Sequence, residues 1–182
     1  MYTILISLLN TAFWLVLHFG TGLFFSYLPK KIQLKLYDYT RSYYKVSDKE
    51  KQILSVLKVS RWKDALPQFN MLFDKSTIGN ISAEHIQAFI RETCKAEIVH
   101  LSIAVLGFLS LLFPVTLNDM EYFPLYLCIA VFIALCQLPF VLIQRYNRPR
   151  LLRLLKRLSK ATYAQCILDK LYFRIYATLS LH

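Results

Sequence analysis

Three long stretches of this chain contain no charged residue, and this pattern constrains the fold more than any other feature. The stretches are Tyr2–Leu28, Ile98–Leu117 and Tyr122–Ile143, with 27, 20 and 22 residues. About 20 consecutive apolar residues are enough to cross a bilayer as a helix. The sequence therefore predicts an all-α integral membrane protein with three transmembrane helices and flanking cytoplasmic or interfacial amphipathic helices. We expect a single membrane domain over residues 1–182.

Basic residues are concentrated in the segments between and after these runs. Of the 22 Lys and Arg residues, 13 lie in segment 29–97 and nine in segment 144–182. The link 118–121 carries two acids and no base. By the positive-inside rule, the amino terminus of this plasma-membrane protein faces outward, and both basic segments and the carboxyl terminus are cytoplasmic. The net charge of +11 then indicates anionic lipid headgroups or substrate phosphates as partners, and no nucleic acid.

Local signals indicate how the segments outside the bilayer fold. Ser47–Glu50 has the spacing of a capping box. A long helix is predicted from an N-cap at Ser82 to about Phe113. Ile32, Leu34 and Leu36 alternate with polar residues, which favours a short extended piece, and a loop is expected over 74–80. Leu151–Leu158 has one leucine face and one basic face, which predicts an amphipathic helix in the membrane plane.

The sequence Glu97-Ile98-Val99-His100 is the first candidate site. Residues three apart share one face of a helix, and this pair lies where the predicted helix enters the bilayer. Ionisable groups are costly at that depth. A carboxylate beside an imidazole orients the ring and raises its basicity, as removal of a hydroxyl proton requires. The structural alternative is a helix-end pair that packs against an arginine.

The second candidate site is Gln144–Arg150, with three arginines, a tyrosine and an asparagine in seven residues. Arginine binds phosphates and carboxylates with two parallel hydrogen bonds, and asparagine suits sugar hydroxyls. Pro149 is expected to stiffen a turn here. The alternative is a cluster that only anchors the third run. Because a short link makes the second and third runs antiparallel neighbours, we expect both candidate sites side by side at one membrane depth, with Arg61-Trp62-Lys63 docked at the same level.

Other kinds of site are poorly supported. The four cysteines form no CxxC pair, so the sequence predicts neither a disulfide framework nor a metal site. GxSxG, P-loop and GxGxxG motifs are absent from the sequence. We therefore expect no bound cofactor.

Two of these segments carry a family resemblance. Lys95–His100 followed by an apolar run, then Leu138-Pro139 and Gln144–Leu151, resembles the glycosyl-4,4'-diaponeurosporenoate acyltransferases. These are small membrane enzymes of staphyloxanthin-type carotenoid biosynthesis. The resemblance covers residues 10–157, and the tail after Leu158 departs from it. It implies transfer of a fatty acyl group to a sugar hydroxyl of a glycosylated carotenoid or related glycolipid.

The expected mechanism follows from this reaction. His100 takes the proton from the acceptor hydroxyl, and Glu97 holds the imidazole. The hydroxyl attacks an acyl-CoA-like thioester directly, since no convincing serine or cysteine nucleophile is present. Phosphates of the donor, or the oxyanion, are expected to bind three arginines: Arg145, Arg148 and Arg150. The other predicted substrate-binding residues are Trp62, Lys63, Tyr146 and Asn147, among which Trp62 and Asn147 seat the sugar.

Two other kinds of function stay open from the residues alone. The chain could be a non-enzymatic membrane subunit or scaffold whose basic inner surface gathers anionic lipids. In that case the Glu97–His100 pair would face tight packing between the second and third runs. A lipid carrier or transporter subunit would need a polar path across the bilayer, and the three runs hold few strongly polar residues.

Overall fold

The computed structural model describes residues 2–66, 82–117 and 120–179, and all regular structure in these ranges is helical. Three helices contain stretches long and apolar enough to cross a membrane: Ile6–Tyr27, Ala83–Thr116 and Met120–Ala161. The predicted all-α membrane fold with three transmembrane helices is therefore confirmed. The elements in chain order are α1 (Tyr2–Tyr27), α2 (Lys30–Leu36), η1 (Ser42–Tyr44), α3 (Asp48–Val56), α4 (Val59–Trp62), α5 (Ala83–Leu106), η3 (Gly107–Leu111), α6 (Leu112–Thr116), η4 (Met120–Tyr122) and α7 (Phe123–Leu179).

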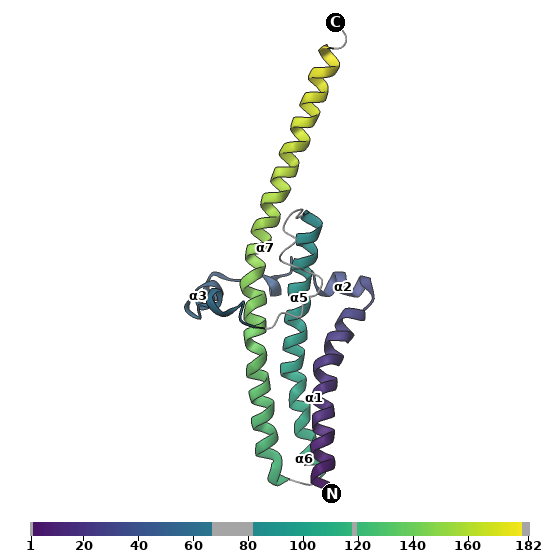
Figure 1. Cartoon of the computed structure of the whole chain (residues 1–182), viewed down its shortest axis with the longest axis vertical. Helices are drawn as coiled ribbons and strands as arrows, with labels where there is room; N and C mark the ends of the chain where they lie inside the picture. Colours follow the sequence, from purple (N-terminus) through teal and green to yellow (C-terminus); the bar gives the residue numbers. More distant parts are fainter. Residues whose placement is uncertain (1, 67–81, 118–119, 180–182) are drawn as a thin grey trace.

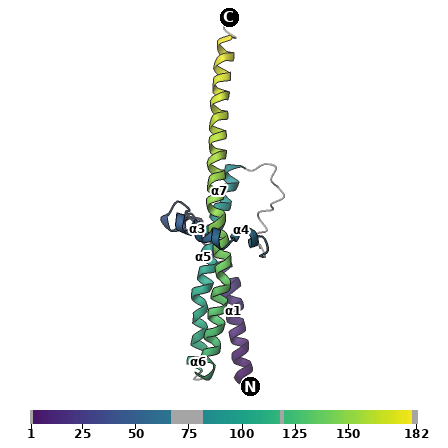
Figure 2. The ribbon, with the colours of Figure 1, turned by 90° about the vertical axis from the view of Figure 1, so that its left-hand side faces the viewer.

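The three long helices form a bundle in which α5 packs against both α1 and α7. The amino terminus and α6 lie at one end of the bundle, and α7 continues far beyond the other end to the carboxyl terminus (Figures 1 and 2). The short helices α2, α3 and α4 surround the bundle near the level where α1 ends (Figures 1 and 2). We call this level, where the charged residues of α5 and α7 meet, the basic end of the bundle.

Close contact between α1 and η3 depends on a glycine. A Cβ atom added at Gly107 would lie 2.7 Å from Cη2 of Trp14, which is too short for two carbon atoms. Only a residue without a side chain therefore lets the indole lie against this part of the backbone. Small residues are a common way for membrane helices to approach one another.

The helix α7 is longer than the sequence indicates. It contains Pro139 and Pro149 and continues through both. The predicted turn at Gln144–Arg150 is therefore wrong, and so is the separate in-plane helix at Leu151–Leu158, which is part of the same helix. Each proline removes one backbone hydrogen bond, but the leucines, arginines and lysines that follow are strong helix formers and extend the helix.

The connection after α1 is also helical. The extended piece predicted at Ile32–Leu36 is wrong, because these residues belong to α2. Gln33 donates to the carbonyl oxygens of Ser26 and Leu28 at 3.0 and 2.7 Å, and thereby ties α2 to the end of α1. The hydroxyl of Tyr37 donates to the carbonyl of Phe25 at 2.6 Å. Burial, followed by the nearby charge of Glu92, raises the pKa of Tyr37 to about 12, so this tyrosine stays neutral.

The two predicted helix starts are confirmed. In the capping box, Ser47 Oγ accepts from the Glu50 amide at 3.2 Å, and Glu50 Oε2 accepts from the Ser47 amide at 3.0 Å. Ser82 Oγ caps α5 by accepting from the His85 amide at 3.1 Å. The helix that begins there continues through η3 and α6 to Thr116, close to the predicted end. The expected loop over 74–80 lies outside the described residues.

Candidate functional site

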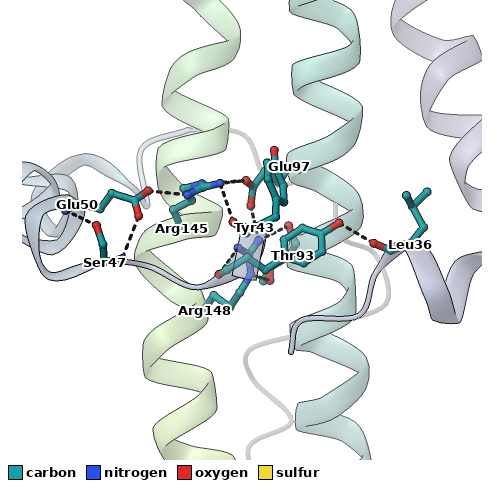
Figure 3. A network of polar contacts seen from close by, with 9 residues as sticks. Leu36, Tyr43, Ser47, Glu50, Thr93, Glu97, Arg145 and Arg148 are labelled. Carbon is teal, nitrogen blue, oxygen red and sulfur yellow. Dashed lines mark hydrogen bonds and ion pairs between the residues drawn. The ribbon is translucent and has the colours of Figure 1, made fainter. Parts of the chain in front are cut away.

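The centre of the basic end is the carboxylate of Glu97, which is completely buried between α5 and α7. Its Oε1 accepts from Arg145 Nε at 2.8 Å and lies 2.7 Å from Arg145 Nη2. Its Oε2 accepts from Arg148 Nη2 at 2.6 Å. Two arginines from adjacent turns of α7 therefore hold one carboxylate of α5 (Figure 3). A buried charge is tolerated only when it is paired and hydrogen-bonded in this way.

Arg148 is as deeply buried as its partner, with an exposed fraction of 0%. Besides Glu97, its guanidinium donates to Thr93 Oγ1 at 3.1 Å, to the Thr93 carbonyl at 3.2 Å and to the Tyr44 carbonyl at 3.2 Å. Its Cζ also lies 4.9 Å from the centroid of the Tyr44 ring. Each nitrogen of the guanidinium thus has an acceptor within the protein. Arg148 therefore connects α7 to η1 and α5. The expectation that it binds donor phosphates does not fit this geometry, because the guanidinium is buried and each of its nitrogens already donates within the protein.

Arg145 extends the network toward α3. Its Nη1 donates to Glu50 Oε1 at 2.6 Å, and its Nη2 donates to the Tyr43 carbonyl at 3.2 Å. Glu50 is also the residue that closes the capping box with Ser47 (Figure 3). Partial burial raises the pKa of Glu50, but the hydrogen bonds from Ser47 and Arg145 outweigh burial and lower it overall. The cluster of Glu50, Glu97, Arg145 and Arg148, which we call the ionic cluster, balances two acids with two bases.

His100 has a different partner from the one predicted. Its Nδ1 lies 2.8 Å from Gln137 Oε1 on α7, and its ring stacks on Phe140 with centroids 4.6 Å apart. Both carboxylate oxygens of Glu97 are occupied by arginines, so the expectation that Glu97 holds the imidazole is wrong. The physical reason is charge: an arginine compensates a buried carboxylate fully, whereas a neutral imidazole does not.

The remaining predicted site residues lie on α7 and at the end of α4. Trp62 donates from Nε1 to the Leu57 carbonyl at 2.9 Å. Like Tyr146, it packs against the buried cluster of Leu54, Val59 and Ile143. Lys63 pairs with Asp64 through Nζ at 2.6 Å. The exposed Arg150 places its Cζ 3.9 Å from the Tyr146 ring centroid. Asn147 is half-buried on the same stretch of α7.

Two polar groups near this surface have capacity for a further partner. The Tyr146 hydroxyl is buried and has no hydrogen-bond partner among the described residues. The structure shows no hydrogen bond from the Asn147 side chain within the same part of the chain. A buried hydroxyl without a partner is unfavourable, and the Tyr146 hydroxyl is not accessible to a molecule outside the chain in this structure. Asn147 and the exposed Arg150 are therefore the predicted residues best placed to contact a polar headgroup.

Sequence reasoning missed the residues that complete both networks. Thr93, Tyr43, Tyr44 and Glu50 support the two arginines, but they are far from α7 in sequence, and no local spacing links them. Gln137 could have been found, because it is a strongly polar residue in the third apolar run, and polar groups in membranes are usually hydrogen-bonded. In the described ranges, no group of three or more His, Cys, Asp and Glu side chains could hold a metal ion.

Comparison with known proteins gives a consistent result. Residues 35–157 match the family model described as glycosyl-4,4'-diaponeurosporenoate acyltransferase. A glycosyl-4,4'-diaponeurosporenoate acyltransferase of Staphylococcus haemolyticus is 26% identical over 153 residues, which cover 80% of this chain and 82% of that protein. The enzyme of the same name from Staphylococcus aureus strain N315 is 29% identical over 106 residues, which cover 56% of this chain and 59% of that protein. No solved structure matches the chain.

Proposed function

Because this chain belongs to the glycosyl-4,4'-diaponeurosporenoate acyltransferase family, we propose that it transfers a fatty acyl group to a sugar hydroxyl of a glycosylated carotenoid. The two relatives compared above are named for this activity. Helices long enough to cross a bilayer suit an acceptor and a product that both carry long apolar chains. The positive-inside rule puts the basic end, and with it the reaction, at the cytoplasmic face.

The observation that carries this proposal at the residue level is the state of His100. Gln137 Oε1 can only accept a hydrogen bond, so this contact favours the tautomer with the proton on Nδ1, in which the neutral ring has its lone pair on Nε2. Gln137 Nε2 donates to the Ile133 carbonyl at 3.4 Å, which fixes the amide in this orientation. A neutral imidazole with a free Nε2 is the form that acts as a general base. Gln137 is therefore the positioning residue that Glu97 was expected to be.

One face of α7 leads from the level of His100 to the basic end. Phe140, Gln144 and Asn147 follow the i, i+4, i+7 spacing that puts side chains on one face of a helix. All three are half-buried. Phe140 stacks on His100, and the two amides lie on successive turns toward the basic end. Amide side chains both donate and accept, so this strip suits the hydroxyls of a sugar that approaches His100.

The proposed reaction uses an acyl-CoA-like thioester as donor. Nε2 of His100 takes the proton of the sugar hydroxyl while its oxygen forms a bond to the acyl carbonyl carbon. The C–S bond then breaks, and the thiolate receives the proton from His100, which regenerates the neutral base. The donor phosphates need basic side chains outside the ionic cluster, because Arg145 and Arg148 are already paired with Glu50 and Glu97. Arg150 and the exposed basic residues on the next turns of α7 meet this condition: Arg153, Lys156 and Arg157.

A direct test is acyl transfer in lipid nanodiscs with a glycosylated carotenoid acceptor and a labelled acyl-CoA donor. We expect His100→Asn to lower kcat by about 10²–10⁴-fold, the usual contribution of a general base. We expect Gln137→Leu to lower kcat with little change in KM, because it misplaces the base without removing a substrate contact.

The matched control is His85→Asn, which removes an exposed imidazole at the start of α5 and should leave activity unchanged. Each variant is first checked for insertion and for its unfolding midpoint in detergent. If His100→Asn inserts normally and keeps wild-type activity, the assignment of the base is wrong. If neither this variant nor the wild type acylates any glycosylated lipid, the proposed reaction itself is wrong.

A further inference from the structure

A groove with a volume of about 500 Å³ lies beside α5 at the basic end. On α5 it follows a stripe of residues at helical spacing that faces a different direction from His100. Its other wall is formed by the end of α2 and by η1. The lining residues are Leu36, Arg41, Tyr43, Tyr44, Ile98, Leu101, Ser102, Val105 and Leu106.

The wall on α5 lies in the uncharged run Ile98–Leu117, and so beside the lipid chains of a bilayer. From Ile98 to Leu106 it extends over nine residues, and the eight rises of 1.5 Å between them give a length of about 12 Å. All of its side chains except Ser102 are aliphatic. Val105 is 69% exposed and Leu106 41% exposed, so the groove is open to the side. These features suit a segment of a fatty acyl chain.

The opposite end of the groove is polar and positively charged. Arg41 lines it, is exposed, and shows no hydrogen bond or ion pair from its guanidinium within the described part of the chain. The carboxylate of Asp38 interacts electrostatically with both Arg41 and Arg91, and its Oδ1 accepts from Thr40. Arg41 and Arg91 thus share the single negative charge of Asp38, so this group of three residues carries a net positive charge.

Tyr43 and Tyr44 separate this charged end from the ionic cluster. The Tyr43 ring lies against Arg145, with 5.3 Å between Cζ and the centroid, and the Tyr44 ring lies against Arg148. Both tyrosines also line the groove. Whatever occupies the groove therefore packs on the two rings that cover the ionic cluster.

We propose that the groove binds one anionic phospholipid of the surrounding membrane, with an acyl chain along α5 and the phosphate at Arg41. Apolar walls, lateral opening and an exposed arginine at headgroup depth that shares its nearby carboxylate with a second arginine are complementary to this class of ligand. A guanidinium forms two parallel hydrogen bonds to a phosphate. The proposal does not depend on the acyl-transfer reaction, because the groove and His100 lie on different faces of α5.

The test is native mass spectrometry of the full-length protein in detergent, titrated separately with phosphatidylglycerol and with phosphatidylcholine of the same chains. We expect one phosphatidylglycerol to bind more tightly than phosphatidylcholine. Arg41→Gln should weaken the binding of phosphatidylglycerol about fivefold, which corresponds to the typical contribution of one basic residue near anionic lipid. Arg61→Gln is the matched control, because it removes an exposed arginine on α4, away from the groove.

A second pair of variants tests the chain-binding wall. Val105→Trp fills the groove and should remove the tightly bound lipid, whereas Val115→Trp adds the same volume at a lipid-facing position outside the groove and should not. Both variants are compared for their unfolding midpoints, so that loss of the fold is not mistaken for loss of the site. Equal binding of the two lipids, or retention of phosphatidylglycerol by both Arg41→Gln and Val105→Trp, would overturn the proposal.

Discussion

Replacement of Arg148 by methionine tests the central claim that the ionic cluster holds the two longest helices together. Methionine keeps much of the side-chain volume but removes the charge and every donor. Glu97 then loses its 2.6 Å bond and remains completely buried, with Arg145 as its only cation. The net charge of the ionic cluster changes from zero to −1. Removal of one partner of a buried ion pair costs about 3–5 kcal/mol.

Three further hydrogen bonds from Arg148 are lost in the same variant, to Thr93 Oγ1, Thr93 O and Tyr44 O. Because these acceptors are neutral, each contributes about 0.5–1.5 kcal/mol. The remaining pairing of Glu97 with Arg145 opposes the loss. We therefore expect a total destabilisation near the lower limit of the range for a broken buried pair, about 3 kcal/mol.

The assay is unfolding of the detergent-solubilised protein by increasing mole fractions of SDS, followed by tryptophan fluorescence. Arg150→Met is the matched control, because Arg150 is exposed and stacks on Tyr146 alone, so its loss should cost less than about 1 kcal/mol.

The double variant Glu97→Gln/Arg148→Met separates charge from packing. It restores a net charge of zero in the cluster, because Glu50 and Arg145 still balance each other. It should therefore be more stable than Arg148→Met alone. The reasoning is refuted if Arg148→Met unfolds within about 1 kcal/mol of the wild type, or if the double variant shows the sum of the two single effects.

Two other predictions concern the helix contacts. Gly107→Ala should destabilise the bundle by about 1–3 kcal/mol, because the new Cβ would lie 2.7 Å from Trp14. Gly22 has open space around it, so Gly22→Ala should be neutral or stabilising in the same unfolding assay. The contact between Glu50 and Arg145 should weaken at low pH. Because folding lowers the pKa of Glu50, the ionised carboxylate stabilises the folded protein at pH values above 4.5, its ordinary pKa, and this stabilisation is lost as the pH falls below that value. Glu50→Gln should therefore flatten this part of a profile of stability against pH.

Much of the fold could be predicted from short-range patterns. Uncharged runs identify the three bundle helices, and capping residues at Ser47 and Ser82 locate two helix starts, because both signals depend on neighbouring residues only. The continuous α7 could not be predicted, because a proline at position 149 between two arginines also fits a turn. The choice depends on how well the following residues propagate a helix.

The sequence predicted where the candidate site lies, but it did not predict which side chains pair with Glu97. The short link between the second and third runs correctly indicated that Glu97, Arg145 and Arg148 would lie side by side. Spacing within one helix could not reveal that Glu97 prefers two arginines of another helix over His100 three residues away. That choice depends on burial, since a carboxylate without water needs a full positive charge. The topology relative to the membrane remains a prediction.

The pairing of Glu97 with Arg145 and Arg148 has a consequence for biosynthesis. When α5 leaves the ribosome and reaches the insertion machinery, Glu97 lacks both of its cations, because the two arginines are 48 or more residues away along the chain. A lone charge costs about 2.5–3.5 kcal/mol at the centre of a membrane helix even in the translocon, and Glu97 at the entry to the bilayer carries part of this cost. The second and third spans should therefore enter the lipid together as a hairpin, so that the charges neutralise each other before either helix is released.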